Sequence, residues 1–179
     1  MTTAAKSTVG TTMYVLDASV SPHAVLAIPA LKGLSNVGGG KRKKIDKSTF
    51  DSVGYNENQG GRADPPEATG ELVLNKSLVG HQKVKALFEA QARGAVDNIE
   101  VFIGDADGTA PPTIVGGHLV APQTASPKKW ARSGTLGVGY ISSFSPKKVD
   151  DDIDRADFAF QFSGGATWVN KGDLISITY

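Results

Sequence analysis

The stretch 157–163, DFAFQFS, constrains the fold of this chain more than any other. Phenylalanines stand at 158, 160 and 162 and alternate with smaller or polar residues. Successive side chains of a β-strand point to opposite faces, so this spacing puts three aromatic rings on one face. The sequence therefore predicts a half-buried strand that places Phe158, Phe160 and Phe162 in the core of a sheet.

Short apolar or alternating runs between glycine and proline turns predict further strands along the chain. We expect them at 13–16, 24–28, 71–75, 99–103, 113–121, 129–142 and 173–179. Together with 157–163 and a strand that resumes at 45–50, this pattern gives about seven to nine strands.

One helix is predicted, at residues 80–93. Val84, Leu87 and Phe88 fall at positions i, i+3 and i+4 and form one apolar stripe, and Gly94 is placed to cap the end of the helix. A helix cannot bury such a stripe alone, so it should lie against a sheet. The expected fold is mainly β, a sandwich or barrel with one flanking helix.

Between two predicted strands lies the long polar stretch 49–70, TFDSVGYNENQGGRADPPEATG. Structureless loops longer than about 12–15 residues are uncommon in compact domains and are usually functional or disordered. Residues 1–12 are expected to form a flexible arm, and 13–179 a single domain that carries this long loop.

Charge and cysteine content exclude several functions. The formal net charge is +1, whereas a protein that grips DNA usually shows a basic excess. The chain contains no cysteine, which excludes disulfides and thiolate metal sites and suits a reducing cytoplasm. Its N-terminus lacks a signal-peptide pattern and no apolar run is long enough to span a membrane, so we expect a soluble protein made in the cytoplasm.

No motif predicts catalysis, a cofactor or a metal. GGGKRK at 38–43 fails the phosphate-loop spacing, and GDADG at 104–108 lacks the later acids of a calcium loop. His23, His81 and His118 have no partners at metal-ligand spacing. The sequence therefore predicts a protein that is not an enzyme.

Two dense charge blocks of opposite sign stand out, and both are expected at turn tips. They are either solvated faces or complementary contacts across a subunit interface, where opposite potentials set register. The residues of the proposed contact are Lys41, Arg42, Lys43 and Lys44 with Asp150, Asp151, Asp152 and Asp154.

Two stretches, residues 44–75 and 133–168, together resemble the tail tube, or major tail, proteins of long-tailed bacteriophages. Residues 44–75, KIDKSTFDSVGYNENQGGRADPPEATGELVLN, are similar to the family's strand, polar loop and strand. Residues 133–168, SGTLGVGYISSFSPKKVDDDIDRADFAFQFSGGATW, are similar to its closing pattern of a strand, an acidic connection and an alternating strand.

The resemblance implies hexameric rings that stack into a tube, with joined inner sheets lining a lumen through which the double-stranded genome passes without binding specifically. It implies the tape measure protein and tail terminator or tip proteins as partners, a place in the virion tail, and bridging of successive rings by the long loop and the N-terminal arm. Ordering each backbone residue costs about 1–2 kcal/mol, so such a loop should be mobile until a neighbour covers it. The residues assigned to this inter-ring loop are Phe50, Asp51, Tyr55, Asn56, Glu57, Arg62, Asp64, Pro65 and Pro66.

Two other interpretations stay open. A tube protein of a type VI-like secretion system would share the architecture. A β-rich ligand-binding module, for instance for carbohydrate, would need an aromatic platform, and the only tryptophans are Trp130 and Trp168, outside any aromatic cluster.

Overall fold

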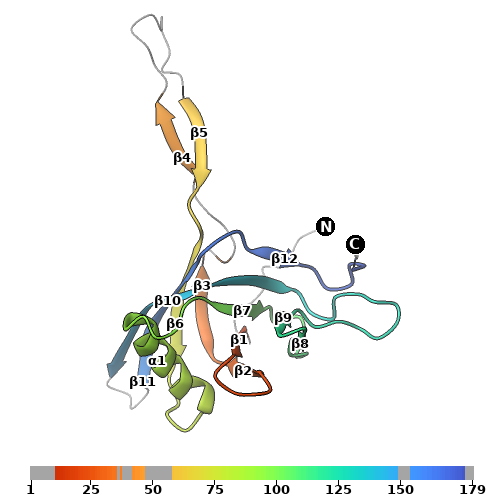
Figure 1. Cartoon of the computed structure of the whole chain (residues 1–179), viewed down its shortest axis with the longest axis horizontal. Helices are drawn as coiled ribbons and strands as arrows, with labels where there is room; N and C mark the ends of the chain where they lie inside the picture. The colour runs from red at the N-terminus through yellow and green to blue at the C-terminus, as the bar shows by residue number, and fades with distance from the viewer. Residues whose placement is uncertain (1–10, 36, 38–41, 47–57, 149–153, 176–179) are drawn as a thin grey trace, which may run out of the picture.

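A computed structural model describes residues 11–35, 37, 42–46, 58–148 and 154–175, and the side chains of residues 42–46, 58–63 and 148 are outside the description. Within these ranges the chain forms twelve strands and one helix (Figure 1). They are β1 (Thr12–Asp17), β2 (Ala24–Ile28), β3 (Leu31–Ser35), β4 (Arg42–Asp46), β5 (Asn58–Ala63), β6 (Glu67–Val73), α1 (Val79–Ala92), β7 (Ile99–Gly104), β8 (Thr113–Val115), β9 (His118–Val120), β10 (Gly134–Lys148), β11 (Asp154–Phe162) and β12 (Thr167–Val169). The predicted fold class, mainly β with one helix, is confirmed.

Eight strands form one antiparallel sheet in the order β2-β1-β7-β10-β11-β6-β3, with β12 paired to β10. The fifteen-residue β10 is its central strand and pairs with β7, β11 and β12. Glycines in β10 allow the close approach of β11: a side chain at Gly137 would meet the Phe162 ring at 2.6 Å, and one at Gly139 would meet the Gln161 carbonyl at 2.1 Å.

The main core lies on one face of this sheet, as the aromatic alternation predicts. Phe158, Phe160 and Phe162 are at most 2% exposed, and the Phe160 and Phe162 rings meet edge to face with their centroids 5.1 Å apart. The intervening side chains of β11 point to the opposite face. The sequence therefore assigned both faces of β11 correctly.

Helix α1 covers the same face, which confirms the predicted apolar stripe. Val84 and Leu87 are buried and Phe88 packs against Phe144. Gly94, directly beyond the C-cap, adopts a φ of +67°, the left-handed conformation that favours glycine after a helix. The side-chain oxygen of Gln91 accepts a hydrogen bond of 3.0 Å from the backbone N–H of Ile141, which ties the end of α1 to β10.

A second apolar cluster lies on the other face of the sheet, over β1 and β7. It includes Tyr14 and Phe102 and is covered by the β8–β9 hairpin. Arg132 is 1% exposed beside it and donates to the Asp105 carbonyl at 2.7 Å, the Gly104 carbonyl at 3.1 Å and the Tyr14 hydroxyl at 2.9 Å. This side chain fixes the turn after β7 to the segment that leads into β10.

The prediction of an unstructured stretch at 49–70 is wrong where the structure describes it. Residues Asn58–Ala63 pair with Arg42–Asp46 as the β4–β5 hairpin, and the rest from residue 67 belongs to β6. The hydrogen bonds between paired strands join backbone N–H and C=O groups and do not depend on the side chains. The glycine-rich segment NQGGRA can therefore form a strand although it has no apolar pattern. Arg42, Lys43 and Lys44 therefore lie in a strand and not at a turn tip.

Other strands also differ from expectation, and two of them, β3 and β12, were not predicted. Residues 113–121 form a hairpin, because Gly116 and Gly117 adopt positive φ angles and reverse the chain. The strand expected at 129–142 begins only at residue 134 and continues to residue 148. The described part of 173–179 makes a single bridge, from Leu174 to Lys129, and a strand that the pattern missed, β12, precedes it.

Candidate assembly surfaces

The β4–β5 hairpin projects from one end of the sheet, whereas the β1–β2 turn and the start of α1 lie at the opposite end (Figure 1). Its strands are antiparallel, with Arg42 opposite Ala63 and Asp46 opposite Asn58. Within the described residues, neither strand pairs with the eight-stranded sheet. The hairpin is therefore an arm whose backbone edges meet no other described strand of the chain.

At the base of this arm, two of the predicted loop residues are fixed to the body. The Pro66 carbonyl accepts a hydrogen bond of 3.0 Å from the Phe162 backbone N–H, and the Gln161 side-chain amide donates to the Pro65 carbonyl at 2.9 Å. Pro66 is buried, while Asp64 and Pro65 are exposed. The predicted interface residues at 50, 51 and 55–57 lie outside the described residues, as does the side chain of Arg62.

Of the acidic block, only Asp154 is described. It begins β11, forms an ion pair with Lys76, and accepts a backbone hydrogen bond of 2.8 Å from Leu74. Residues 150–152 and Lys41 lie outside the described residues, and so do the side chains of residues 42–44. In Figure 1 the start of β11 lies at the end of the body away from β4. Asp154 is therefore far from the basic strand of its own chain.

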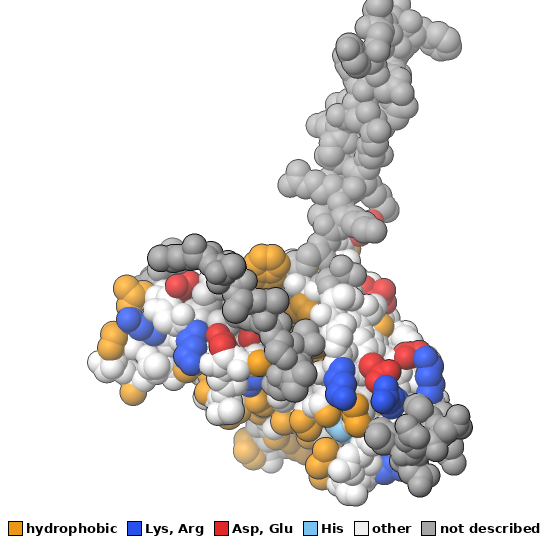
Figure 2. All heavy atoms as spheres, turned by 180° about the vertical axis from the view of Figure 1, so that it is seen from behind, with side chains coloured by type: hydrophobic (Ala, Val, Ile, Leu, Met, Phe, Trp, Pro, Cys, Tyr) orange, Lys and Arg blue, Asp and Glu red, His pale blue; other side chains and the backbone are white. Residues whose placement is uncertain are grey.

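The uncovered half of the sheet presents a polar face on β10, β11, β6 and β3, here called the open face. Its six charged residues are Lys32, Glu67, Glu71, Lys147, Arg155 and Asp157. Lys147 forms an ion pair with Asp157, and Arg155 with Glu71 at 3.0 Å, while the Ser142 hydroxyl donates to Glu67 at 2.6 Å. Positive and negative residues are equal in number on this face, and Figure 2 likewise shows the two signs intermixed on the body.

The register explains why these pairs run diagonally across the strands. Lys147 lies directly opposite Arg155, and Asp157 directly opposite Glu71. Like charges directly opposite each other repel. Each cation therefore forms a more favourable ion pair with the acid that lies diagonally across from it on the neighbouring strand. Sequence reasoning missed these residues because their pairing depends on which strands are neighbours.

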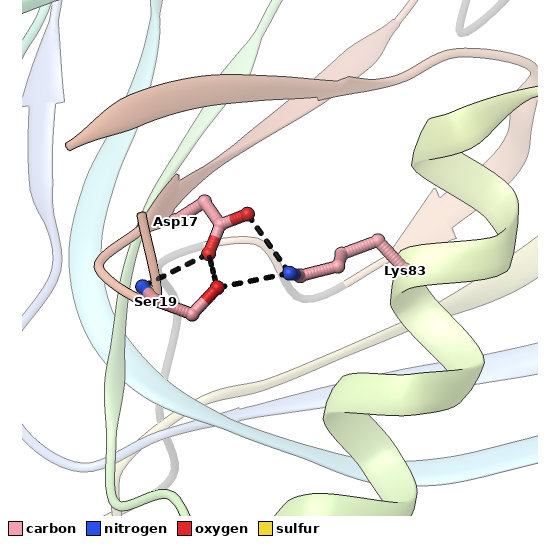
Figure 3. A network of polar contacts seen from close by, with 3 residues as sticks. All are labelled: Asp17, Ser19 and Lys83. Carbon is pink, nitrogen blue, oxygen red and sulfur yellow. Dashed lines mark hydrogen bonds and ion pairs between the residues drawn. The ribbon is translucent and has the colours of Figure 1, made fainter. Parts of the chain in front are cut away.

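Figure 3 shows a polar clasp between the β1–β2 turn and α1, formed by Asp17, Ser19 and Lys83. The Lys83 ammonium lies 2.9 Å from Asp17 Oδ2 and donates to Ser19 Oγ at 3.0 Å, while the Ser19 hydroxyl and backbone N–H both donate to Asp17 Oδ1. Burial by itself raises the pKa of Asp17, but the hydrogen bonds from Ser19 and Lys83 and the Lys83 charge outweigh it, so the pKa lies below its ordinary value. The clasp fixes the position of α1 on the end of the molecule opposite the arm.

A cleft of about 500 Å³ lies beside this clasp, between α1 and the end of β1. Leu16, Ala86, Leu87 and Ala90 give it apolar walls. Among the described residues, no group of three or more His, Cys, Asp or Glu is placed to hold a metal ion. No helix in the described ranges is long and apolar enough to cross a membrane.

Comparison with known proteins adds an independent line of evidence. A family model described as phage tail tube, TTP, lambda-like matches residues 4–172. The fold is similar to a chain in the structure titled "Cryo-EM structure of the anti-feeding prophage (AFP) baseplate, 6-fold symmetrised", with a TM-score of 0.55 and 10% sequence identity over 95% of this chain and 98% of that chain. A search of curated proteins gave no match.

Proposed function

The chain belongs to the lambda-like phage tail tube family, and from this premise we propose that it is the repeating subunit of a tail tube. Membership makes it a structural component of the phage tail. We further propose that it forms hexameric rings, that the rings stack, and that the genome enters the host through their lumen. The observation that carries this proposal is the arm that projects beyond the sheet, because a compact monomer gains nothing from it.

Closure of a ring would explain the edges of the sheet. Among the described strands, β2 pairs only with β1 and β3 only with β6, so each keeps one free edge. Free edges promote association, and joining sheets around a ring removes them. The baseplate structure that this fold resembles is titled 6-fold symmetrised, which supports six as the number of copies.

The open face is the candidate lining of the lumen. Helix α1 and the main core occupy the opposite face, so the described part of the sheet itself offers its polar side chains to a water-filled channel on the open face. Each DNA phosphate that a cation neutralises strengthens binding, and here Lys147 and Arg155 are already paired with acids. This face would let DNA pass without holding it.

The arm is the candidate contact between successive rings. The predicted interface residues Tyr55 and Arg62 are of the types that anchor interfaces, and Asp64 and Pro65 lie exposed at its base. The basic block 41–44 and the acidic block 150–154 are also candidates for this contact between successive rings. Because β4 and the start of β11 lie at opposite ends of the body, we propose that any contact between the basic strand and Asp154 joins different copies.

Negative-stain microscopy of the purified protein at high concentration tests the function directly. We expect hollow tubes or stacked rings, and a persistent monomer would contradict the proposal. The matched variant replaces residues 43–62 with a two-residue turn between Arg42 and Ala63, which face each other across the hairpin. This variant should stay folded, because neither strand pairs with the main sheet, and it should form no tubes.

The charge blocks allow a separate test. Reversing Asp150, Asp151 and Asp152 to lysine should impair assembly, and also reversing residues 41–44 to acids should partly restore it. Equal and additive defects would argue against direct pairing.

A tube protein of a secretion-type machine is the second candidate, favoured by the likeness to the prophage baseplate chain. For the phage tube, we propose synthesis in the host cytoplasm, association with the tape measure and with terminator or tip proteins, and no catalytic role. Isolation of phage particles that contain the chain in their tails would separate the two candidates.

A further inference from the structure

We propose that the β1–β2 turn and the start of α1 form the surface on which the arm of the next copy docks. We call this surface the receiving end and define it by Val20, Leu78 and Val79. The inference rests on the proposed function and adds to it the partner surface of the arm, which neither the family nor the resemblance in fold assigns to residues of this chain.

The polarity of the molecule is the first argument. The arm leaves one end of the body, and the β1–β2 turn and the start of α1 lie at the other (Figure 1). Identical subunits stacked in the same orientation make heterologous contacts, in which one end of a copy meets the opposite end of the next. A projecting arm therefore reaches the receiving end of its neighbour first.

The second argument is the apolar surface at that end. Val79 is 68% exposed, Val20 43% and Leu78 39%. Val20 follows Ser19 directly, and Val79 precedes Lys83 by one helical turn, so both border the clasp. Figure 2 shows hydrophobic side chains along the lower edge of the body, away from the arm. Exposed apolar side chains gathered at one end of a soluble protein are typical of interaction sites.

The third argument is that this surface is held in place. The clasp joins the β1–β2 turn to α1, and a side chain added at Gly80 would lie 2.0 Å from the Ala27 carbonyl, so the helix start is closely packed on β2. His81 Nε2 also lies 3.0 Å from the Pro29 carbonyl. A surface that is already ordered loses little conformational entropy when a partner binds.

Charge is the fourth argument, because the receiving end is compatible with the basic arm of a second copy. The two strands of the arm contain four cations, Arg42, Lys43, Lys44 and Arg62, against one acid, Asp46. At the receiving end the Lys83 charge is offset by Asp17. The segment that leads to Leu78 contacts Asp154, the last acid of the acidic block. A basic arm thus meets an apolar surface whose neighbouring cations, Lys76 and Lys83, are already paired with acids and do not repel it.

The test is a double substitution, Val20→Lys with Val79→Lys, compared with Val115→Lys as a matched control. Val115 is a valine of similar exposure, 63%, on the β8–β9 hairpin. Thermal unfolding checks that all three proteins fold, mass photometry counts rings, and negative stain counts tubes. We expect the double variant to keep its melting temperature and its rings and to lose at least nine tenths of its tubes, and the control to behave as wild type.

Four outcomes are decisive. If the double variant forms normal tubes, this inference is overturned but the proposed function is not. The same holds if the control loses as many tubes as the double variant. Loss of rings as well as tubes places this surface in lateral contacts and also overturns it. A wild-type protein that forms no tubes contradicts the proposed function itself.

The absence of cysteine allows a second measurement that does not depend on the lysine variants. Copies with Val79→Cys are mixed with copies carrying Gln59→Cys on the arm and treated with a bis-maleimide after assembly. Cross-linked dimers should form in sedimented tubes and not in dilute protein. If Val115→Cys links to the arm instead, the receiving end is wrongly assigned.

Discussion

The clasp at the receiving end gives the sharpest prediction for stability, through Asp17→Asn. Asp17 makes contacts with Lys83 and with Ser19. Of these, only the contact with Lys83 joins the turn to the helix, because the bonds from Ser19 lie within the turn. A hydrogen bond to a charged group contributes about 1.5–3 kcal/mol when buried, and an exposed ion pair about 0.2–1 kcal/mol. The Asp17 side chain is 12% exposed and Lys83 30%, so an intermediate value applies. We expect Asp17→Asn to lower the free energy of unfolding by about 1–2 kcal/mol.

A double-mutant cycle with Lys83→Met measures the contact itself. Urea unfolding at low protein concentration, where the chain is unassembled, should give a coupling energy near 1 kcal/mol. The control is Lys85→Met in the exposed pair Lys85–Glu89, whose charged atoms are 3.6 Å apart, and it should change stability by less than about 0.5 kcal/mol. A coupling below about 0.3 kcal/mol would refute the reasoning, because independent sites add within that margin.

The same variant has a defined pH dependence. The pKa of Asp17 is lowered in the folded state, so the ionised carboxylate adds stability that is fully present above the pKa of the unfolded chain. This contribution disappears as the pH falls through the lowered folded pKa. Wild type should therefore exceed Asp17→Asn in stability at neutral pH and lose that advantage in acid. An advantage that stays constant over the acid range would contradict the assigned cause.

Three further predictions concern the body of the protein. Phe160→Ala should destabilise by about 3–5 kcal/mol, because it empties a fully buried site, and calorimetry of the unassembled chain measures this. Arg132→Leu should cost about 3 kcal/mol or more, because buried acceptors lose their donors; a cost below about 1 kcal/mol in urea unfolding would argue against those bonds. Gly80→Ala should destabilise by about 1–3 kcal/mol, because its methyl group meets the Ala27 carbonyl, whereas Gly164→Ala, with nothing within 4 Å, should stay within about 0.5 kcal/mol; equal melting temperatures would contradict the packing at Gly80.

Local patterns in the sequence were sufficient for the main core. The alternation in β11 and the stripe Val84, Leu87 and Phe88 correctly indicated which side chains are buried. Both patterns follow from the fixed periods of strand and helix and need no knowledge of the partner element. The same holds for Gly94, since a glycine after a helical stripe is the usual residue in the left-handed position.

Patterns failed where a segment is ordered by its backbone. The strand Asn58–Ala63 contains two glycines and no apolar alternation, so its pairing with β4 left no signal in side chains. The opposite error occurred at 173–179, where an alternating run makes only one bridge within the described residues. Backbone hydrogen bonds are common to all residue types, which is why composition alone did not locate these edges.

What the sequence determined by itself was the β-rich class, the single helix and the faces that they bury. The tertiary structure alone decided which charges meet. Lys83 finds Asp17 and Arg155 finds Glu71 across 66 and 84 positions of the chain, because strand order and helix packing bring them together. It also decided that the arm and the receiving end lie at opposite ends of the body. Local periodicity reaches only a few residues along the chain, whereas assembly surfaces depend on contacts between distant segments.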